Sequence, residues 1–219
     1  MRPLVLVAHG TKDPAGALTT EALATAVSHE LDLPVTVAYA DVREPRLSQV
    51  LMDHAVVVPA FLASGYHVRV DVPAEITRSG RRHITLTPAL GAAPELVAVA
   101  ALRLVEAGWR SGDAVVLGAA GSSDEGALAE VRTAAALLAD RLGDEVAIGY
   151  VTTAAPGLGT ALETARRTGR RVSVASWLLA PGLFHQALRV AGHAVVAEPL
   201  GPHHRVVDLI VRRYRDAIV

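Results

Sequence analysis

The stretch Leu4-Val5-Leu6-Val7-Ala8-His9-Gly10 decides the fold, because its pattern occurs twice in the chain. The second copy reads Val115-Val116-Leu117-Gly118-Ala119-Ala120-Gly121, so the apolar run and its terminal glycine recur. At the same offset, Pro45 aligns with Pro156. Turn residues and apolar runs that stay in register over this distance predict an internal duplication, in which both halves adopt one fold.

Short runs of Val, Leu and Ile alternate with longer segments of helical pattern. The predicted strands are 3–8, 34–40, 55–62, 82–87, 113–118, 145–152, 171–178 and 193–198. They are apolar on both faces, which is typical of buried parallel strands. Asp13 before Pro14 predicts the start of a helix over 14–31, and Asp124 opens another over 124–142. The sequence therefore predicts an α/β protein with two similar domains, each a four-stranded parallel sheet flanked by helices.

The length of 219 residues accommodates two domains of about 110 residues each. The segment Gly108–Gly112 interrupts the alternation and is predicted to be the junction. The expected domains are therefore 1–109 and 110–219. Apolar side chains make up 51% of the chain, enough for a sizeable core in each domain.

Composition excludes several classes of function. The net charge of −1 gives no basic field for nucleic-acid binding. No apolar run approaches the roughly 20 residues of a membrane span, and the first residues lack the apolar segment of a signal peptide. We therefore expect a cytoplasmic protein without nucleic-acid or membrane partners. Because the chain has no cysteine, a bound metal must be held by His, Asp, Glu or backbone oxygen.

Three residues that can bind a metal follow three successive predicted strands. His9 follows the first strand, Glu44 the second and His67 the third. In open parallel sheets, ligands bind beyond the carboxyl ends of the strands. In the second copy, Ala120 and Ala155 stand where the first copy has His9 and Glu44. A repeated scaffold with unequal ligands predicts one active site, in the first domain.

Imidazoles and a carboxylate without thiolates suit Fe(II), Co(II), Ni(II) or Zn(II). Two His and one Glu also leave coordination positions open for a substrate. A histidine titrates near pH 6.5, so His9 and His67 are candidates for metal ligands, for general bases, or for both in turn. The alternative for Glu44 is a carboxylate that introduces the next helix, where the helix dipole favours negative charge.

The remaining histidines carry weaker expectations. His185 aligns with His67, and its role is open between lining a cleft and being a remnant of the duplication. His203 and His204 begin the last predicted helix and are expected at the surface. Structural or solvated roles are expected for His29, His54, His83 and His193.

Taken together, these motifs resemble the sirohydrochlorin chelatase family over essentially the whole chain. The most specific part is 57–73, which reads Val-Val-Pro-Ala-Phe-Leu-Ala-Ser-Gly-Tyr-His-Val-Arg-Val-Asp-Val-Pro. The stretches Leu6–Asp13, Glu44-Pro45 and Leu200–His203 support it. The resemblance implies a fused two-domain class II chelatase, a lyase that inserts Fe(II) or Co(II) into sirohydrochlorin and whose second site is degenerate.

The resemblance also implies roles for particular residues. His9 would be proton acceptor and metal ligand, His67 the second ligand and Glu44 the third. The residues expected to contact the macrocycle are Arg46, Leu62, Ala63, Ser64, Gly65 and Tyr66. Candidates to meet the carboxylates on the rim of this flat, apolar tetrapyrrole are Lys12, Arg43, Arg46, Arg69 and Arg189. A wide cleft between the halves is expected to hold it, and a monomer would suffice. No cofactor beyond the divalent metal substrate is expected.

Other functions remain open or are disfavoured. Fe(II) and the siroheme branch are preferred, with Co(II) and cobalamin synthesis as the alternative. A non-catalytic carrier of metal or tetrapyrrole would use the same three residues. Histidine phosphatases have Arg before His-Gly, whereas this chain has Ala8, so the phosphate clamp is missing. A two-domain small-molecule binding protein usually carries an export signal, which is absent.

Overall fold

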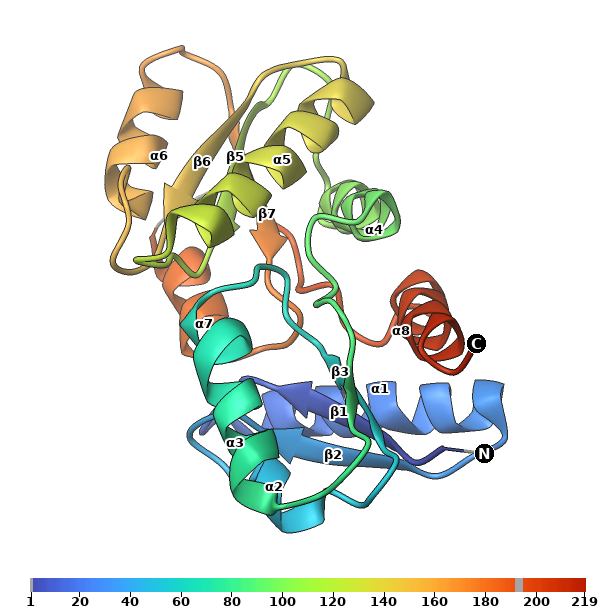
Figure 1. Cartoon of the computed structure of the whole chain (residues 1–219). Coiled ribbons are helices and arrows are strands. Elements are labelled where there is room, and N and C mark those ends of the chain that lie inside the picture. Colours follow the sequence, from blue (N-terminus) through green and yellow to red (C-terminus); the bar gives the residue numbers. More distant parts are fainter. Residues whose placement is uncertain (1, 192–194) are drawn as a thin grey trace. The chain divides into compact units, whose positions relative to one another are not determined.

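The structure is a computed structural model that describes residues 2–191 and 195–219 (Figure 1). The chain forms two compact units. The first combines Met1–Gly91 with Gly201–Val219, and the second is Ala92–Leu200. His193, for which a structural role was expected, lies outside the described residues.

The first unit is built on a parallel sheet in the order β2-β1-β3-β4. Its strands are β1 (Leu4–Ala8), β2 (Val35–Tyr39), β3 (Val56–Pro59) and β4 (Thr85–Leu86). Its helices are α1 (Pro14–Leu31), α2 (Leu47–Val50), the π-helical turn η1 (His67–Asp71), α3 (Val72–Ser79) and α8 (His204–Asp216). The central strand β1 pairs with β2 on one edge and β3 on the other, and its residues are buried along its whole length.

The second unit repeats this topology with a parallel sheet in the order β6-β5-β7-β8. Its strands are β5 (Ala114–Ala119), β6 (Val146–Tyr150), β7 (Val172–Trp177) and β8 (Val195–Val196). Its helices are α4 (Pro94–Glu106), α5 (Glu125–Leu142), α6 (Leu158–Arg166) and α7 (Leu183–Val190). The predicted α/β architecture of two duplicated four-stranded parallel sheets is confirmed.

Each predicted strand has its counterpart. β5 is as long as predicted but begins one residue later, whereas β3 and β4 are each four residues shorter than predicted. Within 82–87, only Thr85–Leu86 are extended. His83 has φ 57, which takes this residue out of the extended conformation. The predicted helix start at Asp13 is confirmed, since its Oδ1 accepts a hydrogen bond of 2.9 Å from the Ala15 N–H.

The last helix of each repeat packs in the unit built by the other repeat. α4 follows the first sheet along the chain but contacts α5 and β7, whereas α8 contacts α1 and β3 (Figure 1). The tyrosine Tyr214 on α8 donates a hydrogen bond of 2.6 Å to the carbonyl of Arg2. The units therefore differ from the predicted domains 1–109 and 110–219, and the predicted junction Gly108–Gly112 lies inside the second unit.

A buried carboxylate joins β5 to β7 in the second unit. Asp113 accepts hydrogen bonds from Arg171 Nε at 2.9 Å and Nη2 at 2.7 Å, and from Ser173 Oγ at 2.7 Å. Hydrogen bonding by Arg171 lowers the pKa of Asp113 to about 2. This charged pair fixes the start of both strands.

No helix in the described parts of the chain is long and apolar enough to cross a membrane.

Candidate active site

His9 stands directly after β1, at a turn that requires glycine. Gly10 has φ 96, and a Cβ on it would lie 2.1 Å from the carbonyl oxygen of Asp41. The backbone N–H of Asp41 donates to the His9 carbonyl at 2.9 Å, which ties the loop after β1 to the loop after β2. Only a residue without a side chain lets these two loops approach so closely.

The ring of His9 has one nitrogen engaged. Its Nδ1 lies 3.1 Å from the carbonyl oxygen of Gly10, so Nδ1 is the donor in this hydrogen bond and Nε2 carries the lone pair. Burial lowers the pKa of His9 below 6.5, and the nearby His67 acts in the same direction; the Gly10 carbonyl and Asp41 oppose the shift. The imidazole is therefore neutral at neutral pH and can accept a proton or bind a cation.

His67 is the first residue of η1, which follows the loop after β3. Its Nδ1 lies 2.6 Å from Oδ2 of Asp71, four residues further along the chain. Asp71 is not among the site residues predicted from the sequence. The signal that could have identified it is the four-residue spacing from His67, which matters only if the segment is helical.

The structure brings His9 and His67 together. Their ring centroids are 4.6 Å apart and their planes are inclined by 82°. The ring of Phe61 lies 6.3 Å from His9 and 6.5 Å from His67, so an aromatic side chain borders the pair. Two imidazoles, one directly after β1 and one at the start of η1, thus form the centre of the candidate site.

Glu44 does not join this pair. Its carboxylate accepts a hydrogen bond of 3.0 Å from the Arg46 backbone N–H, and its Oε1 is 3.7 Å from Arg46 Nε. Among the described residues, no group of three or more His, Asp or Glu side chains is arranged to hold a metal ion. A third ligand at Glu44 therefore stays a prediction, and the exposed carboxylate would have to leave Arg46 to provide it.

The loop expected to contact the macrocycle precedes His67. Leu62 is buried, whereas Ala63, Ser64 and Gly65 are partly buried. Tyr66 is 61% exposed, and its ring centroid is 6.4 Å from that of His67. Tyr66 is thus an accessible aromatic surface beside the imidazole pair.

Two of the predicted carboxylate-binding arginines make contacts with the site loops. Arg46 donates from Nη1 to the Ala40 carbonyl at 2.6 Å and has Nη2 3.9 Å from Asp41. Arg69 donates from Nε to the Ser64 carbonyl at 2.7 Å, which braces the loop before His67. Both guanidinium groups therefore support the backbone of the loops that carry the site.

Arg43 and Lys12 lie on the loops that follow β2 and β1. Arg43 donates to the Thr11 carbonyl at 3.3 Å, and its guanidinium carbon is 5.8 Å from the ring centroid of Tyr39. Lys12 is exposed.

In the second unit, the counterpart of His67 is His185, whose side chain is buried within the unit. His185 is 4% exposed, and its Nε2 lies 3.3 Å from the Ala197 carbonyl oxygen. Arg189, the remaining predicted carboxylate partner, has Nη1 3.7 Å from Glu198. His185 is therefore a buried hydrogen-bonding residue.

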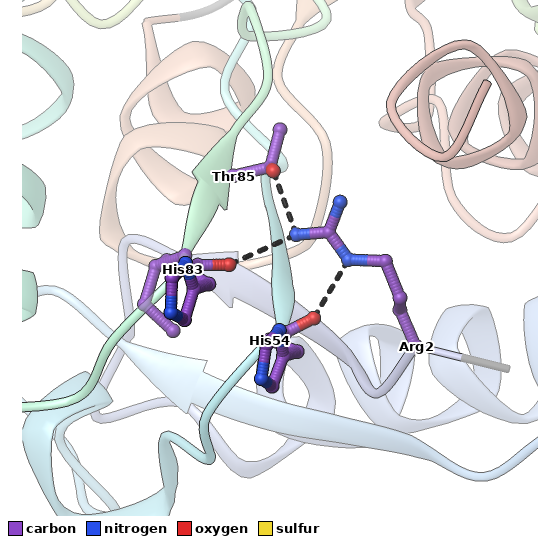
Figure 2. Close-up of a pocket in the computed structure, with 5 residues that line it drawn as sticks. Arg2, His54, His83 and Thr85 are labelled. Atoms are coloured by element: carbon purple, nitrogen blue, oxygen red, sulfur yellow. Dashed lines mark hydrogen bonds between the residues drawn. The ribbon is translucent and has the colours of Figure 1, made fainter.

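Two further histidines form a pair at the amino ends of β3 and β4. His54 and His83 stack with centroids 4.7 Å apart and planes inclined by 7°. They border a cavity of about 390 Å³ together with Arg2, which donates to both their carbonyls and to Thr85 Oγ1 (Figure 2). These hydrogen bonds indicate that the Arg2 guanidinium holds the starts of β3 and β4 together.

His203 has a structural role. Its Nδ1 accepts from the Arg205 N–H at 3.2 Å and caps α8, while its ring lies 4.2 Å from that of His204.

The sequence and structure define the class of protein: two similar α/β units in one chain, the first of which carries the pair His9 and His67, while the second has Ala120 in place of His9. The CbiX family model matches residues 3–107 and again 114–217, so the chain belongs to the CbiX family. The predicted membership of the sirohydrochlorin chelatase family, in its fused form, is confirmed.

Known relatives agree with this assignment. A sirohydrochlorin cobaltochelatase of Methanothermobacter thermautotrophicus is 30% identical over 77 residues, which cover 32% of this chain and 54% of the relative. The match thus spans about half the length of that relative.

Three solved structures resemble the whole chain. SirB from Bacillus subtilis with Fe3+ has a TM-score of 0.79 at 21% identity, covering 99% of this chain and 96% of SirB. The sirohydrochlorin chelatase SirB from Bacillus subtilis subspecies spizizenii in complex with cobalt has 0.79 at 20%, covering 99% and 95%. CbiX, described as the terminal enzyme of siroheme biosynthesis in denitrifying bacteria, has 0.75 at 22%, covering 100% of both chains. At these identities the likeness shows the fold.

Proposed function

We propose that this protein is a chelatase that inserts Fe(II) into sirohydrochlorin and so forms siroheme. The observation that carries this function is the imidazole pair His9 and His67, with ring centroids 4.6 Å apart at the carboxyl end of the first sheet. This pair lies in a chain of the CbiX family and is missing from its second repeat, where Ala120 replaces His9.

Metal insertion has two requirements, and the pair is suited to both. Two pyrrole N–H protons must be removed, and a divalent cation must pass to four ring nitrogens. His9 is neutral at neutral pH because burial lowers its pKa, so its Nε2 can take a proton or hold the cation. Few protein ligands leave most coordination positions open, which lets the macrocycle replace them one after another.

The surrounding residues suit a flat, carboxylate-rimmed substrate. Tyr66 presents an exposed ring beside His67, on which an apolar disc can stack. Lys12 is an exposed cation on the loop after His9 and can meet a rim carboxylate. We assign the macrocycle contacts to Arg46 and to the loop 62–66, and the third metal contact to Glu44. One chain contains both repeats, so we expect a monomer to act.

Co(II) insertion for cobalamin synthesis is the alternative. The curated relative is a cobaltochelatase, and SirB structures contain Fe3+ or cobalt. Fe(II) and Co(II) are neighbours in the affinity order and share ligand preferences, so metal supply contributes to the choice.

The test is anaerobic metal insertion followed by absorption of the product. Fe(II) and Co(II) are offered separately to sirohydrochlorin, with wild type, His9→Ala and His67→Ala. His29→Ala is the matched control, because His29 is an exposed histidine in the last turn of α1. Loss of insertion only in the two site variants supports the assignment, provided that their circular dichroism is unchanged.

Three results would contradict it. Normal turnover in both His9→Ala and His67→Ala would refute the site. Tight binding of metal and tetrapyrrole by the wild type without any turnover would identify a carrier. Faster insertion of Co(II) than of Fe(II) at equal free metal would favour the cobalt alternative.

A further inference from the structure

The carboxylate of Asp71 is bound to His67. Asp71 is the last residue of η1 and continues directly into α3 with α-helical φ −69 and ψ −46, so its side chain is not needed as a helix cap and makes no capping hydrogen bond. Asp13 and Asp124, which precede α1 and α5 in an extended conformation, both use their carboxylates as caps. In Asp71 the carboxylate oxygen Oδ2 is instead 2.6 Å from Nδ1 of His67.

The π-helical turn brings the two side chains into this contact. η1 runs from His67 to Asp71, and the N–H of Val72 donates to the His67 carbonyl. This wider turn sets the imidazole and the carboxylate, four residues apart, on one side of the chain. Both side chains are about one-third exposed, at 32% and 33%, so the ring is reachable from solvent while one of its edges is held.

A carboxylate at Nδ1 decides which nitrogen of His67 is available. A carboxylate accepts hydrogen bonds, so Nδ1 carries the proton and Nε2 keeps its lone pair. His9 is in the same state, because its Nδ1 lies 3.1 Å from the Gly10 carbonyl oxygen. Both imidazoles of the pair thus offer Nε2.

The second repeat supplies an internal comparison. His185, the counterpart of His67, has Arg189 four residues further on where the first repeat has Asp71. Its Nε2 faces the carbonyl oxygen of Ala197 at 3.3 Å. The second repeat therefore has no carboxylate at the position of Asp71. The Nε2 of its remaining imidazole is engaged by the Ala197 carbonyl and lies 4.0 Å from Oε2 of Glu198.

We propose that Asp71 is the positioning residue of the metal centre: it holds His67 as the Nδ1–H tautomer, in a fixed orientation, with Nε2 directed to the incoming cation. The claim that Nε2 of His67 receives the cation rests on the proposed function. Carboxylate partners of ligating histidines raise ligand basicity and fix the ring, and their loss typically weakens metal affinity or activity by about 10–100-fold.

The experiment compares Asp71→Ala, Asp71→Asn and Asp71→Glu with the wild type. Asp71→Asn keeps an acceptor oxygen without the charge, which separates orientation from basicity. The control is Asp53→Asn, which removes a carboxylate from the opposite, amino-end side of β3 where Oδ1 accepts from the Arg82 N–H at 2.9 Å. Circular dichroism and thermal unfolding check that every variant is folded.

The first measurement needs no catalysis. Two-dimensional NMR of ¹⁵N-labelled histidines at pH 8 reports which nitrogen of His67 carries the proton. We expect Nδ1–H in wild type, Asp71→Asn and Asp53→Asn, and a shift towards Nε2–H in Asp71→Ala. The second measurement is Co(II) affinity without tetrapyrrole, which we expect to fall by about 10–100-fold in Asp71→Ala, less in Asp71→Asn, and to recover in part in Asp71→Glu.

The third measurement is insertion, where kcat should fall in Asp71→Ala while KM for the tetrapyrrole stays close to wild type. An unchanged tautomer and unchanged Co(II) affinity in Asp71→Ala would overturn the proposal, as would an equal loss in Asp53→Asn. If the tautomer and affinity respond as expected but no variant inserts metal, the positioning role stands and the proposed function fails. If wild type and Asp71→Ala insert equally well, the positioning role fails and the proposed function stands.

Discussion

Replacing Gly10 by alanine should abolish metal insertion, whereas the same change at its repeat counterpart Gly121 should only destabilise the protein. The two glycines are matched in conformation, with φ 96 and φ 97. A Cβ would lie 2.1 Å from the Asp41 carbonyl oxygen at Gly10 and 2.0 Å from the Thr152 carbonyl oxygen at Gly121. Only Gly10 follows a histidine of the candidate site.

The expected losses of stability and of activity follow from this geometry. A positive φ costs alanine about 1–3 kcal/mol. To relieve the contact, Cβ and the facing carbonyl must separate by about 1 Å, which adds a backbone distortion and brings the total to about 3–5 kcal/mol. Stabilities of about 5–15 kcal/mol leave both variants largely folded. The Asp41 N–H donates to the His9 carbonyl, so a displacement of Asp41 in Gly10→Ala also moves the His9 imidazole. A shift of about 1 Å is expected to slow the reaction roughly 100-fold.

The assay pairs urea unfolding with insertion at a temperature where both variants are folded. We expect similar losses of unfolding free energy, with insertion lost in Gly10→Ala and close to wild type in Gly121→Ala. The reasoning is refuted if the folded Gly10→Ala variant inserts metal as fast as Gly121→Ala.

Three further predictions concern charges. Because burial lowers the pKa of His9, its ring should titrate by NMR with a midpoint below pH 6.5. Between that midpoint and pH 6.5 the unfolded chain binds more protons than the folded one, so the free energy of unfolding should fall as the pH drops through this range. The pKa of Asp113 is lowered from 3.8 to about 2 by Arg171, so its contribution is complete above pH 4 and should be lost as pH falls towards 2. That loss should be about 1–2 kcal/mol in urea unfolding, after allowance for the solvent-exposed side of the pair, and Asp113→Asn should not show it. Glu44→Gln should lower Co(II) affinity by roughly tenfold or more if Glu44 is the third ligand, and titration calorimetry measures it; an unchanged affinity excludes Glu44 from the centre.

Local sequence signals predicted the strands and helix starts well. The apolar run Leu4–Ala8 is a fully buried central strand, and Asp13 caps α1 as its position before Pro14 indicated. These features depend on neighbouring residues alone, so they can be read from the order of amino acids.

Features that depend on distant partners could not be predicted in this way. The apolar face of α8 predicts that this helix is buried, but not that it packs on β3 of the first unit. The position of His9 and His67 after neighbouring strands predicted that they lie close together, and they do. Strand position does not determine where a flexible side chain points, and Glu44 is bound to Arg46. The sequence predicts His67 in a loop, where a spacing of four residues does not bring side chains together; its contact with Asp71 depends on the helical turn η1.

The exchange of α4 and α8 affects how the protein can be divided. A fragment cut between the two sequence repeats would lack α8, whose residues Val206, Leu209 and Ile210 are fully covered in the unit that contains the imidazole pair. Such a fragment would expose an uncovered sheet face and tend to aggregate. When the two fragments are produced together, each carries the helix that the other lacks: the first supplies α4 and the second supplies α8. The fragments are therefore suited to split-protein complementation.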